Sequence, residues 1–201
     1  MAERRHPTAE RLVQTVSDML DSENPHEILV DEVLRISGVQ RGSLYHFFGD
    51  FPSLVRATLL HRFSQNVSAD GAAMLQVAEG ASSKEDYWNK IRALSALTQV
   101  PERAATRAER ARLVSLVSSD ADFAASLALE QQRVTDTMAK AISTAQDKGW
   151  VDPQLSPHAI AVFLQAYSLG RVVDDVSAVH LNNEDWQRII ETAIGSFEAR
   201  N

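Results

Sequence analysis

The first 50 residues carry apolar positions at helical spacing, interrupted by residues that end helices. Leu12 and Val16 lie one turn apart and predict a first helix that starts at about Thr8, whose hydroxyl can cap it. The pair Asn24-Pro25 ends this segment, because proline disfavours helical conformation in the residue before it. The pattern indicates an amphipathic helix with one buried face.

Two shorter helices are predicted next. The second runs from about Ile28 to Ser37, and Gly38 is suited to the left-handed conformation that ends it. The third runs from Gln40 to Phe48 before a further glycine. Three short helices with a glycine-containing turn between the second and third form a helix-turn-helix pattern.

The rest of the chain predicts longer helices. Ser82 with Glu85 forms a capping box, Ser156-Pro157 is a strong start signal, and Asn183 can cap the last helix. We place these helices at residues 51–68, 82–98, 101–119, 120–148, 156–179 and from 183 onward.

Strand-type alternation of apolar and polar residues is absent, which favours an all-α fold of eight to nine helices. We expect a three-helix, helix-turn-helix DNA-binding head at residues 1–50. The larger helical body comprises residues 51–201.

Composition restricts the class of protein. The chain has 201 residues, 44% of them hydrophobic, and lacks the roughly 18 consecutive apolar residues of a membrane span. It has no cysteine and no recognisable secretion signal, so we expect a cytoplasmic protein. The net charge of −7 argues against a non-specific nucleic-acid binder. Residues 1–66 are also acidic, with seven arginines against nine Asp or Glu.

Motifs for catalysis, metal binding or cofactor binding were not found. The six histidines have no metal-ligand spacing, and neither a phosphate loop nor a dinucleotide fingerprint is present. We therefore expect no catalytic residues, no metal and no cofactor. An enzyme on a helical scaffold stays as an alternative, which would require a polar cluster buried in the body.

The third predicted helix carries the chemistry of DNA recognition. Leu44 and Phe48 would anchor its inner face, which leaves polar side chains on the outer face. Arginine and glutamine can pair with guanine and adenine, and a glycine allows close approach of the backbone. The predicted DNA-binding residues are Gln40, Arg41, Gly42, Ser43, Tyr45 and His46.

The run from Ser37 to Phe48, SGVQRGSLYHFF, closely resembles the signature of the tetracycline-repressor (TetR) family. The match is dense over about residues 8–60, and beyond residue 70 only the layout of helices is similar. The resemblance implies a third helix that reads a double-stranded DNA operator. It also implies a homodimer formed by the last two helices, and a body pocket whose small-molecule ligand releases the DNA. The expected protein is a regulator, most simply a repressor.

Several positions depart from the family pattern. Phe51 stands where members commonly have a lysine that contacts phosphate, a loss that would weaken salt-dependent binding. Arg4 and Arg5 could compensate by reaching the DNA backbone or minor groove. An alternative is a helical protein of this family whose head has lost DNA binding and acts through a protein partner.

Aromatic and apolar residues of the body supply candidates for the two remaining sites. An aromatic, cysteine-free body suggests an apolar or aromatic ligand. The predicted pocket residues are Tyr87, Trp88, Phe123, Met138, Phe163 and Tyr167. The predicted dimer interface comprises Phe163, Tyr167, Gly170, Trp186, Ile190 and Phe197.

Overall fold

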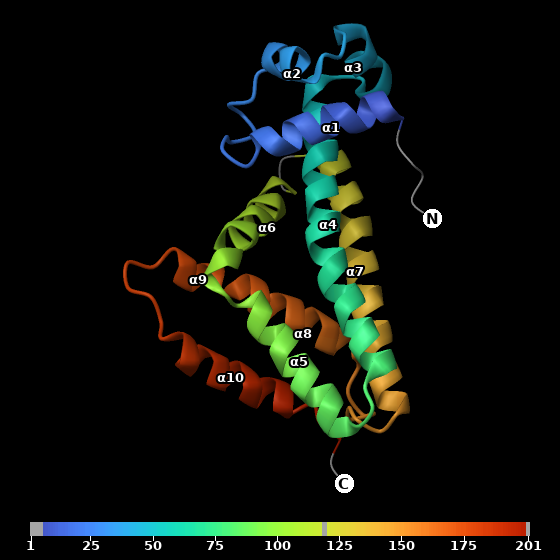
Figure 1. Ribbon diagram of the computed structural model, residues 1–201, viewed down its shortest axis with the longest axis vertical. Helices are drawn as coiled ribbons and strands as arrows, with labels where there is room; N and C mark the ends of the chain where they lie inside the picture. The colour runs from blue at the N-terminus through green and yellow to red at the C-terminus, as the bar shows by residue number, and fades with distance from the viewer. Residues whose placement is uncertain (1–5, 118–119, 200–201) are drawn as a thin grey trace. The chain divides into compact units, whose positions relative to one another are not determined.

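The computed structural model describes residues 6–117 and 120–199, and the regular structure in those ranges is helical (Figure 1). It comprises ten α-helices and one 3-10 turn, and the strand-like pairing found there is a single bridge between Val151 and Glu198. Nine of the helices have eight residues or more, while α9 (Val172–Asp175) is one short turn after α8 (Pro157–Gly170). The predicted all-α fold is confirmed.

The chain forms two compact units, Met1–Gln65 and Asn66–Asn201. The long helix α4 (Phe51–Gly80) begins in the first unit and ends in the second. Among the described helices, none is both long and apolar enough to cross a membrane.

The first unit packs three short helices and the start of α4 around an apolar core. The helices are α1 (Pro7–Met19), α2 (Val30–Ser37) and α3 (Arg41–Phe48). α1 begins one residue before the predicted cap, because His6 accepts a hydrogen bond from the Thr8 amide through Nδ1 at 3.2 Å. The core side chains with no exposed surface are Leu12, Val16, Val33, Leu44 and Leu54.

The turn between α2 and α3 depends on a left-handed residue. Gly38 has φ 65°, a conformation that costs glycine little, and its amide donates to the Leu34 carbonyl at 3.1 Å. The next residue, Val39, is buried and its amide donates to Ser37 Oγ at 3.3 Å. These contacts fix the direction in which the chain enters α3.

α4 is longer than predicted. The sequence indicates an end near residue 68, whereas the helix continues to Gly80. Gly71 lies in its interior, where an added Cβ would be 3.4 Å from Thr137 Cγ2 of α7 (Ala121–Asp147). Close packing between the two helices thus holds a glycine-containing segment in helical conformation.

The second unit consists of the end of α4 and the remaining helices, with α7 against α8 and α10 beside α5 (Figure 1). Side-chain caps start several of them: Ser83 accepts from the Asp86 amide at 3.1 Å and Asp120 from the Phe123 amide at 2.9 Å. The helices not yet given are α5 (Lys84–Thr98), η1 (Pro101–Arg103), α6 (Ala104–Leu116) and α10 (Asn183–Gly195).

Two predictions for this unit were inaccurate in detail. The caps expected at Ser82 and Asn183 are provided by their neighbours Ser83 and Asn182. The helix predicted to reach about residue 179 ends at Gly170, and the short helix α9 follows it. Asp175, the last residue of α9, forms an ion pair with Arg107 of α6.

Candidate DNA-binding surface and ligand cavity

α3 exposes one polar face while its opposite face is buried. Leu44 has no exposed surface, so it anchors α3 in the core, and Phe48 is half-buried. Tyr45, which follows Leu44 in the chain, is 46% exposed. Of the predicted DNA-binding residues, Arg41, Gly42, Tyr45 and His46 of α3 are exposed, as is Gln40 at its N-cap, and Ser43 is half-buried. We refer to these six residues as the α3 face.

The charge on the α3 face is paired within the first unit. The Arg41 guanidinium donates a hydrogen bond to Asp31 of α2. Arg35 of α2 lies 3.4 Å from Glu32 on its own helix. Both pairs are largely exposed, so water and salt screen them, and a competing anion such as phosphate can replace the carboxylate.

An aromatic row supports the last turn of α3. Phe47 stacks on the His6 ring with centroids 4.9 Å apart, and His46 meets Phe47 edge to face at the same centroid distance. The start of α1 and the end of α3 are thereby held together. The role of His6 could not be predicted from local sequence, because it depends on the approach of the two helices.

The N-terminus of α4 holds Phe51, at the position where TetR-family members commonly have a lysine. Phe51 is half-buried, and the amide of Ser53 donates to Asp50 Oδ1 at 2.7 Å. Hydrogen bonds from Ser53 lower the pKa of Asp50. The nearest cation is Arg56, one turn later, whose Nη2 donates to Ser53 Oγ at 2.7 Å. Arg4 and Arg5 lie outside the described residues.

The second unit contains a cavity of about 300 Å³ between its helices. Its walls come from α4, α5, α6, α7, α8, α10 and η1. Of the predicted pocket residues, Met138 and Tyr167 line it. The apolar lining residues are Val67, Ala69, Ala73, Met74, Ile91, Leu94, Leu97, Met138, Leu164 and Ile194.

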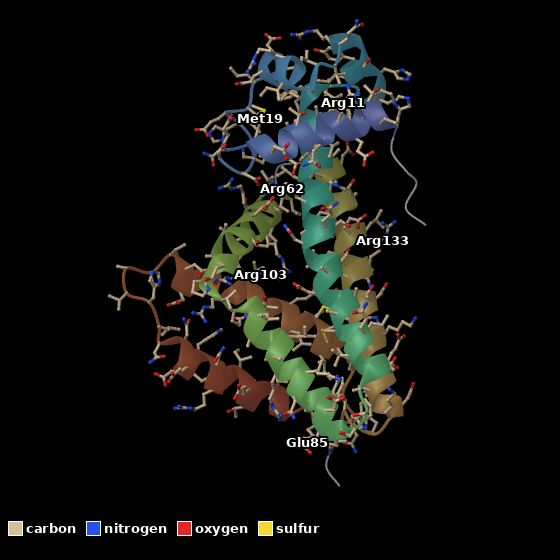
Figure 2. All side chains as sticks on the ribbon, in the orientation of Figure 1. Arg11, Met19, Arg62, Glu85, Arg103 and Arg133 are labelled. Atoms are coloured by element: carbon tan, nitrogen blue, oxygen red, sulfur yellow. The ribbon has the colours of Figure 1, made fainter. Side chains whose placement is uncertain are left out.

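Polar groups are also present in the cavity, which the sequence analysis did not anticipate. Asp70, Arg103 and Arg110 are the charged lining residues, and we call them the polar end. Figure 2 labels Arg103, which lies between α5 and α6. Tyr167 shares a hydrogen bond with Ser95 (Oη to Oγ, 2.6 Å), and burial raises the pKa of Tyr167, so its hydroxyl stays protonated.

The other predicted pocket residues lie elsewhere. Tyr87 and Trp88 are buried beside Trp150, around a void of only about 10 Å³, and the Trp88 indole donates to the Trp150 carbonyl at 3.1 Å. Phe123 is 2% exposed but does not line the 300 Å³ cavity, and neither does Phe163. These side chains pack the core or the surface of the unit.

The predicted interface residues divide into exposed and internal positions. Gly170 is exposed and Phe163 is 39% exposed. Ile190 is 5% exposed, and the Trp186 indole donates to Gln99 Oε1 at 2.8 Å within the same unit. Tyr167 faces the cavity, and Phe197 packs against Phe163 with centroids 5.5 Å apart. Ile189, on the apolar stripe of the last helix, is 63% exposed, and Val162, which the sequence pattern did not indicate, is 55% exposed.

Comparison with known proteins gives similarity in structure. No family model and no curated protein sequence matches the chain. A Mesorhizobium loti protein assigned to the TetR family of transcriptional regulators has a TM-score of 0.72 at 13% identity, with 94% of each chain covered.

Two further structures extend this similarity over nearly the whole chain. Escherichia coli NemR in its reduced form has a TM-score of 0.69 at 16% identity, covering 98% of this chain and 99% of its own. A Rhodococcus protein assigned to the TetR family has a TM-score of 0.64 at 21% identity, covering 94% and 97% respectively. The resemblance seen in the sequence is thus confirmed in three dimensions, and the chain has the fold of TetR-family regulators.

Proposed function

We propose that this protein is a DNA-binding transcriptional regulator, with residues 1–50 as the DNA-binding domain and residues 51–201 as the ligand-binding and dimerisation domain. The observation that carries the proposal is the α3 face: six polar or small residues on a helix whose inner side is anchored by the fully buried Leu44. Such a helix can enter the major groove with its side chains at base edges. Arg41 and Gln40 supply the base-specific donors, while Tyr45 and His46 can reach thymine methyl groups or phosphate.

The regulator acts as a homodimer in this proposal. α8 and α10 expose apolar side chains, with Val162, Phe163 and Ile189 each more than a third exposed. Two copies pairing these helices would bury that surface and present two α3 faces related by a two-fold axis. The expected DNA site is a palindrome with half-sites about 34–36 Å apart, or a multiple of that spacing.

A small molecule in the 300 Å³ cavity would control DNA binding. A ligand changes the affinity for DNA only if it binds one conformation of the dimer better than the other. Because α4 contributes residues to the cavity and begins directly after α3, it is the element through which occupancy could reach the head. Release of DNA on ligand binding would make the protein a repressor.

The test is selection of binding sites from random duplex DNA with purified protein, followed by salt titration on the selected sequence. We expect an enriched palindrome whose affinity falls steeply with salt concentration, as phosphate contacts release counterions. The variant Tyr45→Ala should lose this affinity while it stays folded. Enrichment that is unchanged in Tyr45→Ala would contradict the assignment of the α3 face.

One observation favours a second candidate function. Arg41 is paired with Asp31 in the unbound protein, and Phe51 occupies the usual position of a phosphate-binding lysine. A head with weakened phosphate contacts could instead bind a protein partner. Absence of any enriched DNA sequence, from protein shown to be folded and dimeric, would favour this candidate.

A further inference from the structure

The polar end of the cavity contains a cation whose hydrogen bonds are incomplete. Arg110 Nε is inaccessible to solvent and has no hydrogen-bond partner among the described residues. Burial lowers the pKa of Arg110, while the charge of Asp70 opposes that effect. The guanidinium nevertheless stays charged, as arginine does in proteins. A buried donor without a partner on a charged group is costly, so the fold leaves the hydrogen bonding of this guanidinium incomplete, and Arg110 is at the same time a lining residue of the cavity.

The neighbouring charges leave the polar end positive. Asp70 lies 3.5 Å from Arg103 Nη2, a long contact that leaves the guanidinium able to donate elsewhere. Two arginines and one carboxylate line the cavity, which gives the polar end a net charge of +1. An anion entering the cavity would therefore be attracted to it.

Arg107, an arginine whose hydrogen bonds are satisfied within the fold, contrasts with Arg103 and Arg110 of the polar end. Arg107, also on α6, is 3% exposed and donates to both carboxylate oxygens of Asp175 at 2.6 and 2.7 Å. It also donates to the carbonyls of Thr98 and Val100 at 3.2 Å each. Arg107 is thus satisfied by the fold itself, whereas Arg110 is not, although both lie on the same helix.

The rest of the cavity is apolar. Met74, Ile91, Leu94, Leu164 and Ile194 form walls that come from α4, α5, α8 and α10. A ligand that filled this part would gain free energy by leaving water. The cavity therefore combines apolar walls with a cluster of charged residues that is positive overall.

We propose that this cavity binds an amphipathic monoanion, a carboxylate on an aliphatic or aromatic tail, with the carboxylate accepting hydrogen bonds from Arg110 and Arg103. Arginine favours carboxylates because its planar fork matches the two oxygens. Tyr167 and Ser95 line the same cavity and could orient the tail or a second polar group. This ligand class deepens the proposed function, on which its role as effector rests, but its binding can be measured without DNA.

The experiment compares three head groups on one tail by isothermal titration calorimetry at pH 7: octanoate, octan-1-ol and octylamine. The expected order of affinity is octanoate first, by about tenfold or more over octan-1-ol, with octylamine weakest because the polar end repels a cation. Equal affinity for acid and alcohol would overturn the proposal, and so would preference for the amine. The proposal would also be overturned if none of the acids of six, eight and ten carbons (hexanoate, octanoate and decanoate) bound to the protein.

Variants assign the binding to the polar end. Arg110→Met removes the charge with little change in length, and we expect octanoate affinity to fall about 10- to 100-fold. Arg112→Met is the matched control, because Arg112 is exposed on the same helix and does not line the cavity. Equal octanoate affinity in the Arg110 variant and the wild type would contradict the site.

Two more variants change the other charged residues of the polar end, Arg103 and Asp70. If Arg110→Met does not fold, Arg103→Met tests the same end at a position whose side chain is 38% exposed, with a loss of about tenfold expected. Asp70→Asn removes the one carboxylate that opposes an anion, so octanoate should bind more tightly. If the wild type bound octylamine more tightly than octanoate and Asp70→Asn lost this octylamine binding, the cavity would be a cation site and the proposal would be overturned.

The two proposals can fail separately. Octanoate binding by protein that selects no DNA would uphold the ligand class and contradict the regulator. If the protein selected an operator but bound none of the acids, the regulator would be upheld and the ligand class contradicted. Where both hold, octanoate should change the affinity for the selected DNA, and this change should be absent in Arg110→Met.

Discussion

The two units bury polar groups of different kinds. In the described part of the first unit, the buried polar residues are hydroxyls: Thr15, Ser37 and Thr58. Thr58 donates to the Leu54 carbonyl one turn earlier, at 2.9 Å, so its own helix satisfies it. The second unit also buries a hydroxyl, Thr135, but in addition it buries longer polar side chains with partners far away in the chain: Gln99, Arg107, Gln165 and Arg171.

This difference has a physical cause. A hydroxyl can bond to the carbonyl of its own helix, so it places no condition on tertiary structure. An arginine or glutamine carries several donors and needs partners that only packing can supply. The first unit is held mainly by apolar contacts between nearby helices, although Arg62 also donates to the Ser17 carbonyl at 2.6 Å and to Asp21 at 2.8 Å. The second unit buries more side chains of this kind, and it is there that an arginine can be left available for a ligand.

The largest effect is expected from the buried ion pair. Arg107→Met leaves Asp175, whose side chain is 15% exposed, without its partner, and should destabilise the protein by about 3–5 kcal/mol. The free energy of unfolding in urea measures this. Arg133→Met is the control, since Arg133 projects from α7 at 74% exposure and forms an ion pair with Glu130 of the same helix, so about 0–1 kcal/mol is expected (Figure 2). Similar losses in both variants would contradict the distinction.

The same pair predicts a dependence of stability on pH. Hydrogen bonds from Arg107 lower the pKa of Asp175 below its ordinary value of 3.8 in the folded protein. The stabilisation is therefore fully present above that value and is lost as the pH falls through the lowered pKa. The difference in free energy of unfolding between wild type and Asp175→Asn should be constant near neutral pH and shrink below pH ~4. A pH-independent difference would show that the carboxylate charge is not responsible.

Neighbouring residues on α3 test the apolar packing of the first unit. Leu44→Ala leaves a cavity in the core and should cost about 2–5 kcal/mol of stability. Tyr45→Ala changes a side chain that is 46% exposed, so unfolding should change by no more than about 0.5 kcal/mol. Urea titrations of the two variants compare them directly. A large loss in Tyr45→Ala would mean that the α3 face is structural.

Arg41→Ala should separate DNA affinity from stability. Loss of a bidentate contact to a base should weaken specific DNA binding by about 1–3 kcal/mol and relax one position of the selected sequence. Its ion pair with Asp31 is exposed, so the free energy of unfolding should change by less than about 1 kcal/mol. An unchanged footprint and affinity would place Arg41 outside the contact surface.

The smallest effect is expected from the partner of Arg41. Asp31→Asn removes a carboxylate that competes with DNA for the guanidinium, so DNA affinity should rise about two- to fivefold at low salt. The gain should disappear at high salt, where the pair is screened. Fluorescence anisotropy at two salt concentrations measures both effects, and a fall in affinity would show that Asp31 positions Arg41 for DNA.

Local signals were sufficient for much of the first unit. Gly38 predicted the end of α2 correctly, because the left-handed conformation is a property of the residue itself. The spacing of Leu44 against Tyr45 predicted which side of α3 is buried, because helical periodicity alone separates the two faces. Whether the exposed face binds DNA stays a prediction.

The sequence by itself determined the all-α class, most helix starts, and the buried and exposed sides of α3, since these follow from periodicity and capping within a few residues. Only the tertiary structure decided that α4 continues past Gly71, that Tyr87, Trp88 and Phe123 do not line the large cavity, and that Arg110 does line it while its Nε is buried without a partner. Each of these depends on contacts between residues far apart in the chain, such as Gly71 with Thr137 and Arg107 with Asp175. Such contacts leave no local pattern, because packing and charge pairing act between whichever side chains the fold brings together.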